Sequence, residues 1–233
     1  MAKVFIGVGH GGNDSGAVGY LVEKDVNLQM ALACRDYLEA NGVTVLMSRT
    51  KDENDTVSEE VLECNNFNPS LAVDIHNNAG GGDGFEVYYT KNGGEGKKLA
   101  QAIEKEVKAI GQNSRGCKTR IGDNGQDYYY FIRGTRCPAV ICEGVFVDTK
   151  ADAQQADTKE ECKAFGYAYA RGILATLGIK DKGYNGKNNS EVPKTNTVYR
   201  VQVGSYTIRS NAEKMLQRLE KDGYDAVIMT ANV

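Results

Sequence analysis

The chain has 233 residues, of which 41% are hydrophobic and 25% are charged, a composition typical of a soluble globular protein. Its formal net charge is −3 at pH 7, so neither a nucleic-acid-binding protein nor a membrane-surface protein is indicated. No apolar run approaches the roughly 18 to 20 residues that a membrane span needs. The length allows one domain of ordinary size and a small appendix.

The sequence begins almost directly with an apolar run, Lys3–Val8, without a longer apolar segment or a small-residue cleavage site before it. We therefore expect synthesis in the cytoplasm without a classical export signal, and release by another route if the protein acts outside. The six cysteines form no CxxC pair, which favours reduced structural thiols over a disulfide framework, a zinc knot or a Cys-His protease.

Two predicted strands end in the chain's only histidines. The run Lys3–Val8 is followed by Gly9, His10 and several glycines, and the run Leu71–Ile75 is followed by His76. Apolar runs of this length predict buried strands, and the glycines predict a loop whose backbone can pass close to a ligand, with room for a bulky one. Glycines that only permit a tight turn would give the same pattern. Two histidines at two strand ends indicate one shared site.

The remaining elements alternate between helices and strands. A helix with an Asn-Gly stop covers residues 23–41, with Glu23 at its beginning, and Thr56 with Glu59 predicts a capping box for another helix. Further helices are expected over residues 95–110 and 158–177. Strands are expected at 43–47, 71–76, 84–90, near 118–121, at the aromatic stretch 128–133 and at 138–148.

This alternation predicts an α/β fold of three layers, with a largely parallel twisted sheet and helices on both faces. Ligands in such folds gather at the carboxyl ends of the strands. His10, His76 and Glu143, from the last buried strand, all stand at such ends.

The sequence predicts a catalytic domain over residues 1–179, a linker over 180–197 that is rich in glycine, asparagine and lysine, and a segment over 198–233. Alternation in 198–205, a capping box at Ser210 and Glu213, and an apolar run in 224–230 predict one βαβ unit. With about 36 residues, the unit is smaller than most domains that fold alone.

Catalytic zinc sites take three protein ligands and leave one position for water. Two histidines with Glu23 could supply such a set, and Glu143 could transfer protons beside it. The residues alone leave this reading open, because no HExxH spacing is present and single histidines are more often structural.

Four blocks in order add a resemblance: Val8-Gly-His10-Gly-Gly-Asn-Asp-Ser-Gly-Ala, Glu23-Lys-Asp-Val-Asn-Leu, Asp74-Ile-His76-Asn-Asn78-Ala and Ala139-Val-Ile-Cys-Glu143-Gly-Val-Phe. Together they resemble the zinc-dependent N-acetylmuramoyl-L-alanine amidases of the amidase-3 family over residues 1 to about 178. The resemblance implies that His10, Glu23 and His76 bind Zn²⁺ and that Glu143 is catalytic. It implies hydrolysis of the amide between N-acetylmuramic acid and L-alanine of peptidoglycan.

The sequence departs from the family pattern beside two of these residues. Asp74 stands where the family usually has serine, and Glu143 is followed by Gly-Val-Phe-Val-Asp instead of the usual Gly-Phe pair and asparagine. Asn78 and Arg49 are candidate substrate-binding residues, with loop hydrogen bonding and surface charge as the alternatives.

The C-terminal segment, with Tyr199-Arg-Val-Gln-Val-Gly-Ser-Tyr206, resembles half of a SPOR module, which implies binding to glycan strands of peptidoglycan. Because a full module has two βαβ halves, two chains would complete one as a homodimer. A wall substrate without an export signal favours a phage or prophage endolysin acting at the cell wall after release. A cell-lysis or sporulation autolysin, or a catalytically silent peptidoglycan-binding protein, is the alternative.

Overall fold

The computed structural model describes residues 2–184, 204–221 and 228–229. The chain divides into two compact units, Met1–Lys187 and Asn188–Val233, which are treated separately below. The division falls inside the glycine- and lysine-rich stretch for which the sequence predicts a linker. None of the helices described is long and apolar enough to cross a membrane.

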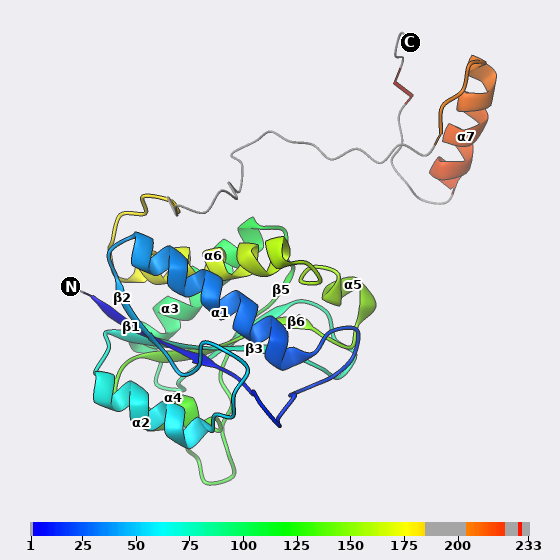
Figure 1. Ribbon diagram of the computed structural model, residues 1–233. Coiled ribbons are helices and arrows are strands. Elements are labelled where there is room, and N and C mark those ends of the chain that lie inside the picture. Colours follow the sequence, from blue (N-terminus) through cyan, green and yellow to red (C-terminus); the bar gives the residue numbers. More distant parts are fainter. Residues whose placement is uncertain (1, 185–203, 222–227, 230–233) are drawn as a thin grey trace. The chain divides into compact units, whose positions relative to one another are not determined.

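Within the described residues, the first unit is built on one six-stranded sheet with the order β2-β1-β3-β6-β4-β5 (Figure 1). Its strands are β1 (Lys3–Val8), β2 (Thr44–Met47), β3 (Leu71–Asn78), β4 (Phe85–Tyr89), β5 (Ser114–Lys118) and β6 (Ala139–Phe146). All neighbouring pairs are parallel except β4 with β6, which are antiparallel. The largely parallel sheet predicted from the sequence is confirmed.

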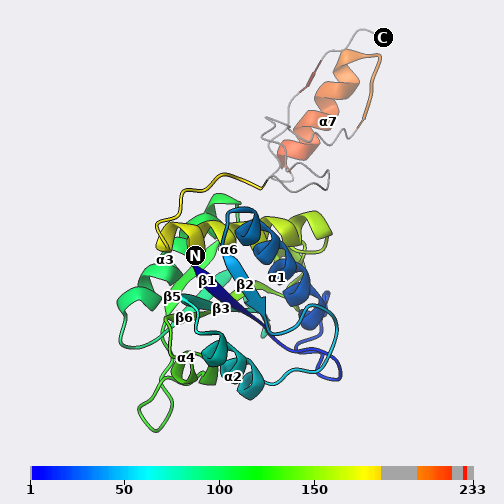
Figure 2. The ribbon, with the colours of Figure 1, turned by 60° about the vertical axis from the view of Figure 1, so that its left-hand side comes forward.

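Helices cover both faces of this sheet (Figures 1 and 2). One face carries α1 (Glu23–Ala40), α3 (Gly94–Ala109) and α6 (Lys159–Thr176), and the other carries α2 (Val57–Phe67) and α4 (Tyr130–Gly134). A short helix, α5 (Lys150–Ala153), follows β6. Because α2 and α4 are short, the second face is covered less completely than the first.

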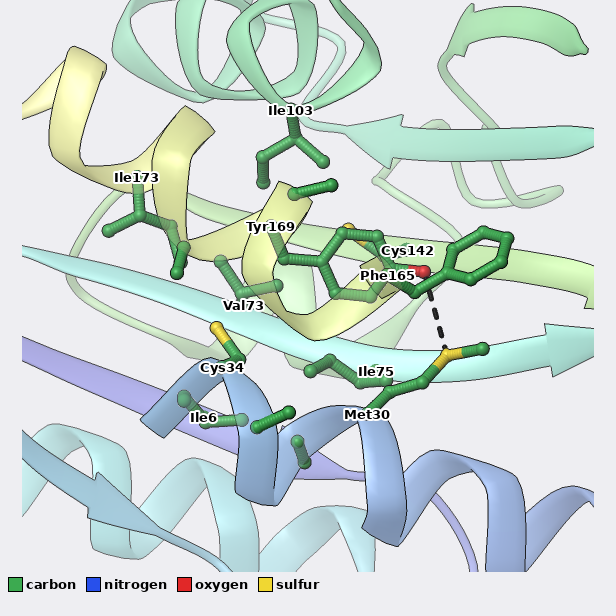
Figure 3. Packing of buried hydrophobic residues seen from close by; sticks show 14 of the residues in the cluster. Ile6, Met30, Cys34, Val73, Ile75, Ile103, Cys142, Phe165, Tyr169 and Ile173 are labelled. Carbon is green, nitrogen blue, oxygen red and sulfur yellow. Dashed lines mark hydrogen bonds between the residues drawn. The ribbon is translucent and has the colours of Figure 1, made fainter. Parts of the chain in front are cut away.

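The larger hydrophobic core lies between the sheet and α1, α3 and α6 (Figure 3). In it, β-branched side chains of the strands, such as Val73 and Ile75, pack against Phe165 and Tyr169 of α6. The buried Tyr169 hydroxyl donates to the Met30 sulfur at 3.9 Å, which satisfies its only donor inside an otherwise apolar core. This packing makes the sheet a rigid support for the strand ends.

Two helices begin with the reciprocal hydrogen bonds of a capping box. Thr56 and Glu59 form the box at α2, as the sequence predicts, and Thr158 with Glu161 forms another at α6. The six cysteines, all within the described residues, are free thiols, in agreement with the predicted reduced state.

The prediction of a strand at residues 128–133 is wrong, because this stretch contains the helix α4. Phe131 and Ile132 are consecutive and both buried. A strand would have sent one of them to each side, whereas one helical turn buries both against the same cluster. The strand expected near 118–121 lies slightly earlier, as β5.

In the second unit, the described residues contain one helix, α7 (Arg209–Lys221), where the capping box at Ser210 predicts a helix. The two strands predicted at 198–205 and 224–230 lie largely outside the described residues, and so does most of the predicted linker.

Candidate metal centre

His10 stands directly after β1, in a backbone conformation that few non-glycine residues adopt. Its φ is +62°, in the left-handed region, and the Gly9 amide donates to the Ile75 carbonyl at 3.0 Å, which continues the β1–β3 pairing up to the turn. The Nδ1 atom of His10 lies 2.8 Å from Oδ2 of Asp14. This contact leaves the Nε2 atom of His10 for another partner.

Glu23 is the first residue of α1, and its carboxylate is buried between the two histidines. Oε1 of Glu23 lies 3.3 Å from Nε2 of His10 and 3.0 Å from Nδ1 of His76. Oε2 accepts from the Ala17 amide at 2.8 Å, so the loop between β1 and α1 is closed on the same side chain. The helix N-terminus also favours a carboxylate at this position.

His76 lies near the end of β3, with one ring nitrogen toward Glu23 and the other toward Asp74. Its Nε2 atom is 3.4 Å from Oδ2 of Asp74. The rings of His10 and His76 meet edge to face, with centroids 5.0 Å apart. The structure therefore brings together the three residues that the resemblance assigns to the metal.

The spacing of these atoms fits a tetrahedral metal site. One nitrogen of each histidine and one oxygen of Glu23 lie within 4.8 Å of one another. Ligands at about 2.0 to 2.1 Å from a tetrahedral Zn²⁺ are about 3.4 Å apart, close to the two observed N–O distances of 3.3 and 3.0 Å. Three such ligands leave the fourth position open, as in catalytic sites.

The charges around the donors agree with this arrangement. Burial opposes ionisation of Glu23, but hydrogen bonds with His10 and His76 outweigh it and lower the pKa of Glu23 well below its usual range. The contact with Glu23 raises the pKa of His10. For His76, burial lowers the pKa, but the charge of Asp74 and contacts with Asp74 and Glu23 raise it above the usual value.

Glu143 lies on β6 next to His76, because the two residues are register partners in the parallel β3–β6 pair. Burial raises the pKa of its carboxyl group to about 7. Among the described residues, no side chain or backbone amide donates a hydrogen bond to this carboxylate. A glutamate with a pKa near neutral and no competing partner is suited to accept and return a proton.

Arg49 and Asn78 occupy different positions relative to this centre. Arg49 is 2% exposed, and its guanidinium donates to the carbonyls of Val8, Gly9, Lys24 and Lys51. That position favours the alternative in which Arg49 forms hydrogen bonds with loops, because it binds the carbonyls of Val8 and Gly9 directly before His10. Asn78 is half-buried on the site side and lies 3.5 Å from Glu86.

Three polar residues that sequence reasoning did not single out as functional also support the centre. Asn27 donates to the Gly9 carbonyl at 2.9 Å and accepts from Asn77 at 2.7 Å, while Asn77 accepts from the Val145 amide at 2.9 Å. This chain of bonds connects β1, α1, β3 and β6 beneath the donors. Asp74 is the third of these residues, through its contact with His76. The presence of aspartate where the family usually has serine was the only signal in the sequence that could have indicated this role.

The glycines around His10 make room for protein atoms and not for a bulky ligand, which corrects the interpretation from the sequence. A Cβ atom on Gly9 would lie 2.1 Å from the His76 ring, and one on Gly16 would lie 2.6 Å from both Glu23 and His10. Gly11 and Gly12 are similarly filled by Glu53 and Asn54. These glycines permit the close approach of the donors themselves.

Two imidazoles and a carboxylate around an open fourth position, beside a glutamate with a pKa near neutral, define a candidate metal-dependent hydrolase on an α/β sheet. Residues 4–175 match the family model of N-acetylmuramoyl-L-alanine amidase, and the chain therefore belongs to the amidase-3 family. Residues 169–230 match the model of the SPOR domain.

Individual relatives agree with this assignment. The sporulation-specific N-acetylmuramoyl-L-alanine amidase of Bacillus subtilis (strain 168) is 32% identical over 234 residues, covering 98% of this chain and 85% of the relative. The endolysin of Bacillus phage SPP1 is 32% identical over 193 residues, covering 78% of this chain and 69% of the relative. The structure of Cwp6 from Clostridium difficile has a TM-score of 0.74 and 38% identity, and covers 76% of this chain and 29% of that chain.

Proposed function

We propose that this amidase binds Zn²⁺ through His10, Glu23 and His76 and hydrolyses the amide between N-acetylmuramic acid and L-alanine, with Glu143 as the catalytic glutamate. The observation that carries the proposal is the fit of the three donor atoms to a tetrahedral site beside Glu143. Membership of the amidase-3 family supports the substrate.

When bound, Zn²⁺ supplies Lewis-acid chemistry, which polarises a carbonyl group and lowers the pKa of water. Glu143 accepts a proton from the attacking water and later delivers it to the amide nitrogen as the C–N bond breaks, so the peptide leaves as a free amine. Glu23 and the two histidines hold their donor atoms in place through Asp14, Asp74 and the Ala17 amide.

The direct test is mass spectrometry of purified cell walls digested with the full chain. The proposal expects new muramic acid termini without peptide, together with free L-alanine amines. Glu143→Gln serves as the control that keeps the donor set. Glycan cleavage or peptide cross-link cleavage instead of these products would contradict the proposal, and so would full activity after chelation. If Glu143→Gln lyses walls as fast as the wild type, Glu143 is not the catalytic residue.

We propose an endolysin as the biological role, and the similarity to the phage SPP1 endolysin supports it. A sporulation autolysin is the second candidate, favoured by the longer match to the sporulation-specific amidase. Deletion of the gene distinguishes the two roles. Loss of an endolysin prevents phage-induced lysis of the host cell, whereas loss of a sporulation autolysin delays release of the spore from the mother cell.

We propose that the second unit binds glycan strands of the wall, because residues 169–230, which include most of this unit, match the model of the SPOR domain. The proposed boundaries near residues 180 and 198 rest on the composition of the sequence. A homodimer that joins two half modules is part of the same proposal. Co-sedimentation with purified walls tests the binding, using the full chain and a chain that ends at residue 187. Light scattering at micromolar concentration tests the dimer, and a strict monomer would contradict it.

A further inference from the structure

A row of charged side chains continues from the metal centre across the sheet. His76 on β3 is paired with Glu143 on β6, and Glu143 is paired with Glu86 on the antiparallel strand β4. Paired residues send their side chains to the same face of a sheet. Glu86 is in turn paired with Gly116 of β5, and the side chains of Arg115 and Lys118 from the same strand contact Glu86.

Glu86 holds these two cations in place. Its side chain is buried, and Oε1 accepts from Nε of Arg115 and, at 2.6 Å, from Nζ of Lys118. Oε2 accepts from the Tyr88 hydroxyl at 2.9 Å and lies 3.5 Å from the Asn78 amide nitrogen. Burial opposes the charge of Glu86, but the hydrogen bonds from Lys118, Arg115 and Tyr88 outweigh it and lower its pKa.

The two cations retain unused capacity for a ligand. Two positive charges face one carboxylate, so the group has a net positive charge. Arg115 uses only Nε toward Glu86, and Lys118 has three N–H groups, while no other hydrogen-bond partner of either head group lies among the described residues. The side chains of Arg115 and Lys118 are 44% and 32% exposed, so the remaining N–H groups are accessible from solvent.

We propose that Arg115 and Lys118, anchored by Glu86, form a subsite for a carboxylate of the peptide part of the substrate. The muramic acid carboxyl group is consumed in the scissile amide, so a free carboxylate at this distance belongs to the peptide. This proposal rests on the proposed amidase function and adds the recognition of an acidic peptide to it.

Strand spacing gives the position of that carboxylate. Neighbouring strands are about 4.8 Å apart, and an extended peptide advances about 3.4 Å per residue. Lys118 and Arg115 meet Glu86 one strand spacing beyond Glu143. The carboxylate therefore belongs to one of the first three residues after the scissile bond.

The test uses two synthetic muramoyl-L-alanyl peptides with amidated C-termini, one with glutamate and the other with glutamine at both the second and the third residue. The wild type is expected to have a KM about tenfold lower for the glutamate peptide, since a charge-assisted hydrogen bond contributes about that factor. Lys118→Met and Arg115→Gln should each remove most of this preference, so that the ratio of the two KM values falls toward one. Lys118→Arg should retain the preference.

Lys105→Met is the matched control, because Lys105 is exposed on α3, which packs on the opposite face of the sheet. Equal losses with both peptides would overturn the proposal, since they would mean that Arg115 and Lys118 act only by shaping Glu86 and Glu143. No difference between the peptides in the wild type would overturn it as well.

Calorimetric binding of both peptides to the Glu143→Gln chain separates this proposal from the amidase assignment. Selective binding of the glutamate peptide without cleavage by the wild type would retain the subsite and reject the proposed reaction. Cleavage of both peptides with equal binding would retain the reaction and reject the subsite. Thermal unfolding of each variant shows whether it is folded.

Discussion

His76 and Glu143 are register partners on the parallel strands β3 and β6, so the sheet itself places a candidate ligand and the proposed catalytic carboxylate on one face. No loop is needed to bring His76 and Glu143 together. Glu23, in contrast, reaches the centre from the first turn of α1. The centre therefore depends on the strand register and on the packing of one helix.

Replacing Glu143 by glutamine tests the division of roles in this arrangement. Glutamine keeps the size of the side chain but cannot accept the proton, so we expect kcat to fall about 10²- to 10⁴-fold, the usual contribution of general acid–base catalysis. Metal content should be unchanged, because no donor is removed. Muropeptide release and metal analysis of the same sample check both statements; a loss of metal together with activity would contradict the separation.

Metal affinity is expected to fall as the pH is lowered. Without metal, contacts with Glu23 raise the pKa of His10, and Asp74 and Glu23 outweigh burial and raise that of His76. Protons therefore begin to compete with the metal at a pH higher than for a free imidazole, and metal is released as the pH falls. Chelator competition from pH 8 to pH 5 measures this, and re-addition of Zn²⁺ at pH 8 should restore activity. An affinity independent of pH would exclude the two rings as ligands.

Asp74→Asn is expected to weaken metal binding 10- to 100-fold, the usual effect of removing the partner of a ligating histidine. The side chain of Asp74 is 3% exposed and faces Nε2 of His76, and its buried Oδ1 atom has no hydrogen-bond partner among the described residues. Asp14→Asn removes the equivalent partner of His10, but the Asp14 side chain is 68% exposed. Because water screens exposed charges, its effect should be smaller. If chelator titrations give equal losses of metal affinity for the two variants, burial of Asp74 does not strengthen its effect on the metal site.

Gly9→Ala is expected to abolish metal binding. The new methyl group would lie 2.1 Å from the His76 ring, and the ring cannot move without losing Glu23. Gly96→Ala is the matched control, since its methyl group meets nothing closer than 3.5 Å in α3, where alanine is the better helix former. Metal analysis and thermal unfolding of both proteins measure the difference. Full metal occupancy in Gly9→Ala would show that the turn is free to move.

The sequence predicts the sheet and the helices well because each apolar run and each cap is a local signal. The Thr56 capping box and the α1 stop after Ala40 lie within a residue or two of their predicted positions. The strand prediction for residues 128–133 was wrong because aromatic residues favour strands locally. Burial of both Phe131 and Ile132 on one side requires a helical turn.

The candidate site could be predicted only from two strands that end near histidines together with the family resemblance, because His10, Glu23 and His76 are separated in the chain. Glu143 lies inside β6 and not, as predicted from the sequence, at its carboxyl end, and its place beside His76 follows from the register of β3 and β6. The contacts of the glycines with the donor residues depend on distances in the folded chain, which the spacing of residues in the sequence does not give. The same holds for the contacts of Glu86 with Arg115 and Lys118. Arg49 is the clearest case, because an arginine after a strand suggests surface charge. Its burial against four carbonyls follows only from the tertiary fold.

Glu60 on α2 provides a prediction about stability that is independent of catalysis. Its side chain is buried, and Oε1 accepts from the Val8 amide at 3.2 Å and from the Ser48 hydroxyl at 3.0 Å. Burial, together with the charge of Asp74, raises the pKa of Glu60 from its ordinary value of 4.5 to about 8. Between these two values the folded state holds a proton that the unfolded chain has lost.

Stability should therefore decrease as the pH rises, because the contribution of Glu60 is fully present below about pH 4.5 and is lost toward pH 8. Glu60→Gln keeps an oxygen that can accept from Val8 and Ser48 but never ionises. At pH 8.5 we expect it to be more stable than the wild type by on the order of 5 kcal/mol, since one pKa unit corresponds to about 1.4 kcal/mol, and at pH 4 the two should be equal. Urea unfolding of the metal-free proteins across this range measures the difference, with the exposed Glu39→Gln as control. A constant difference at all pH values would mean that the substitution changes packing and not ionisation.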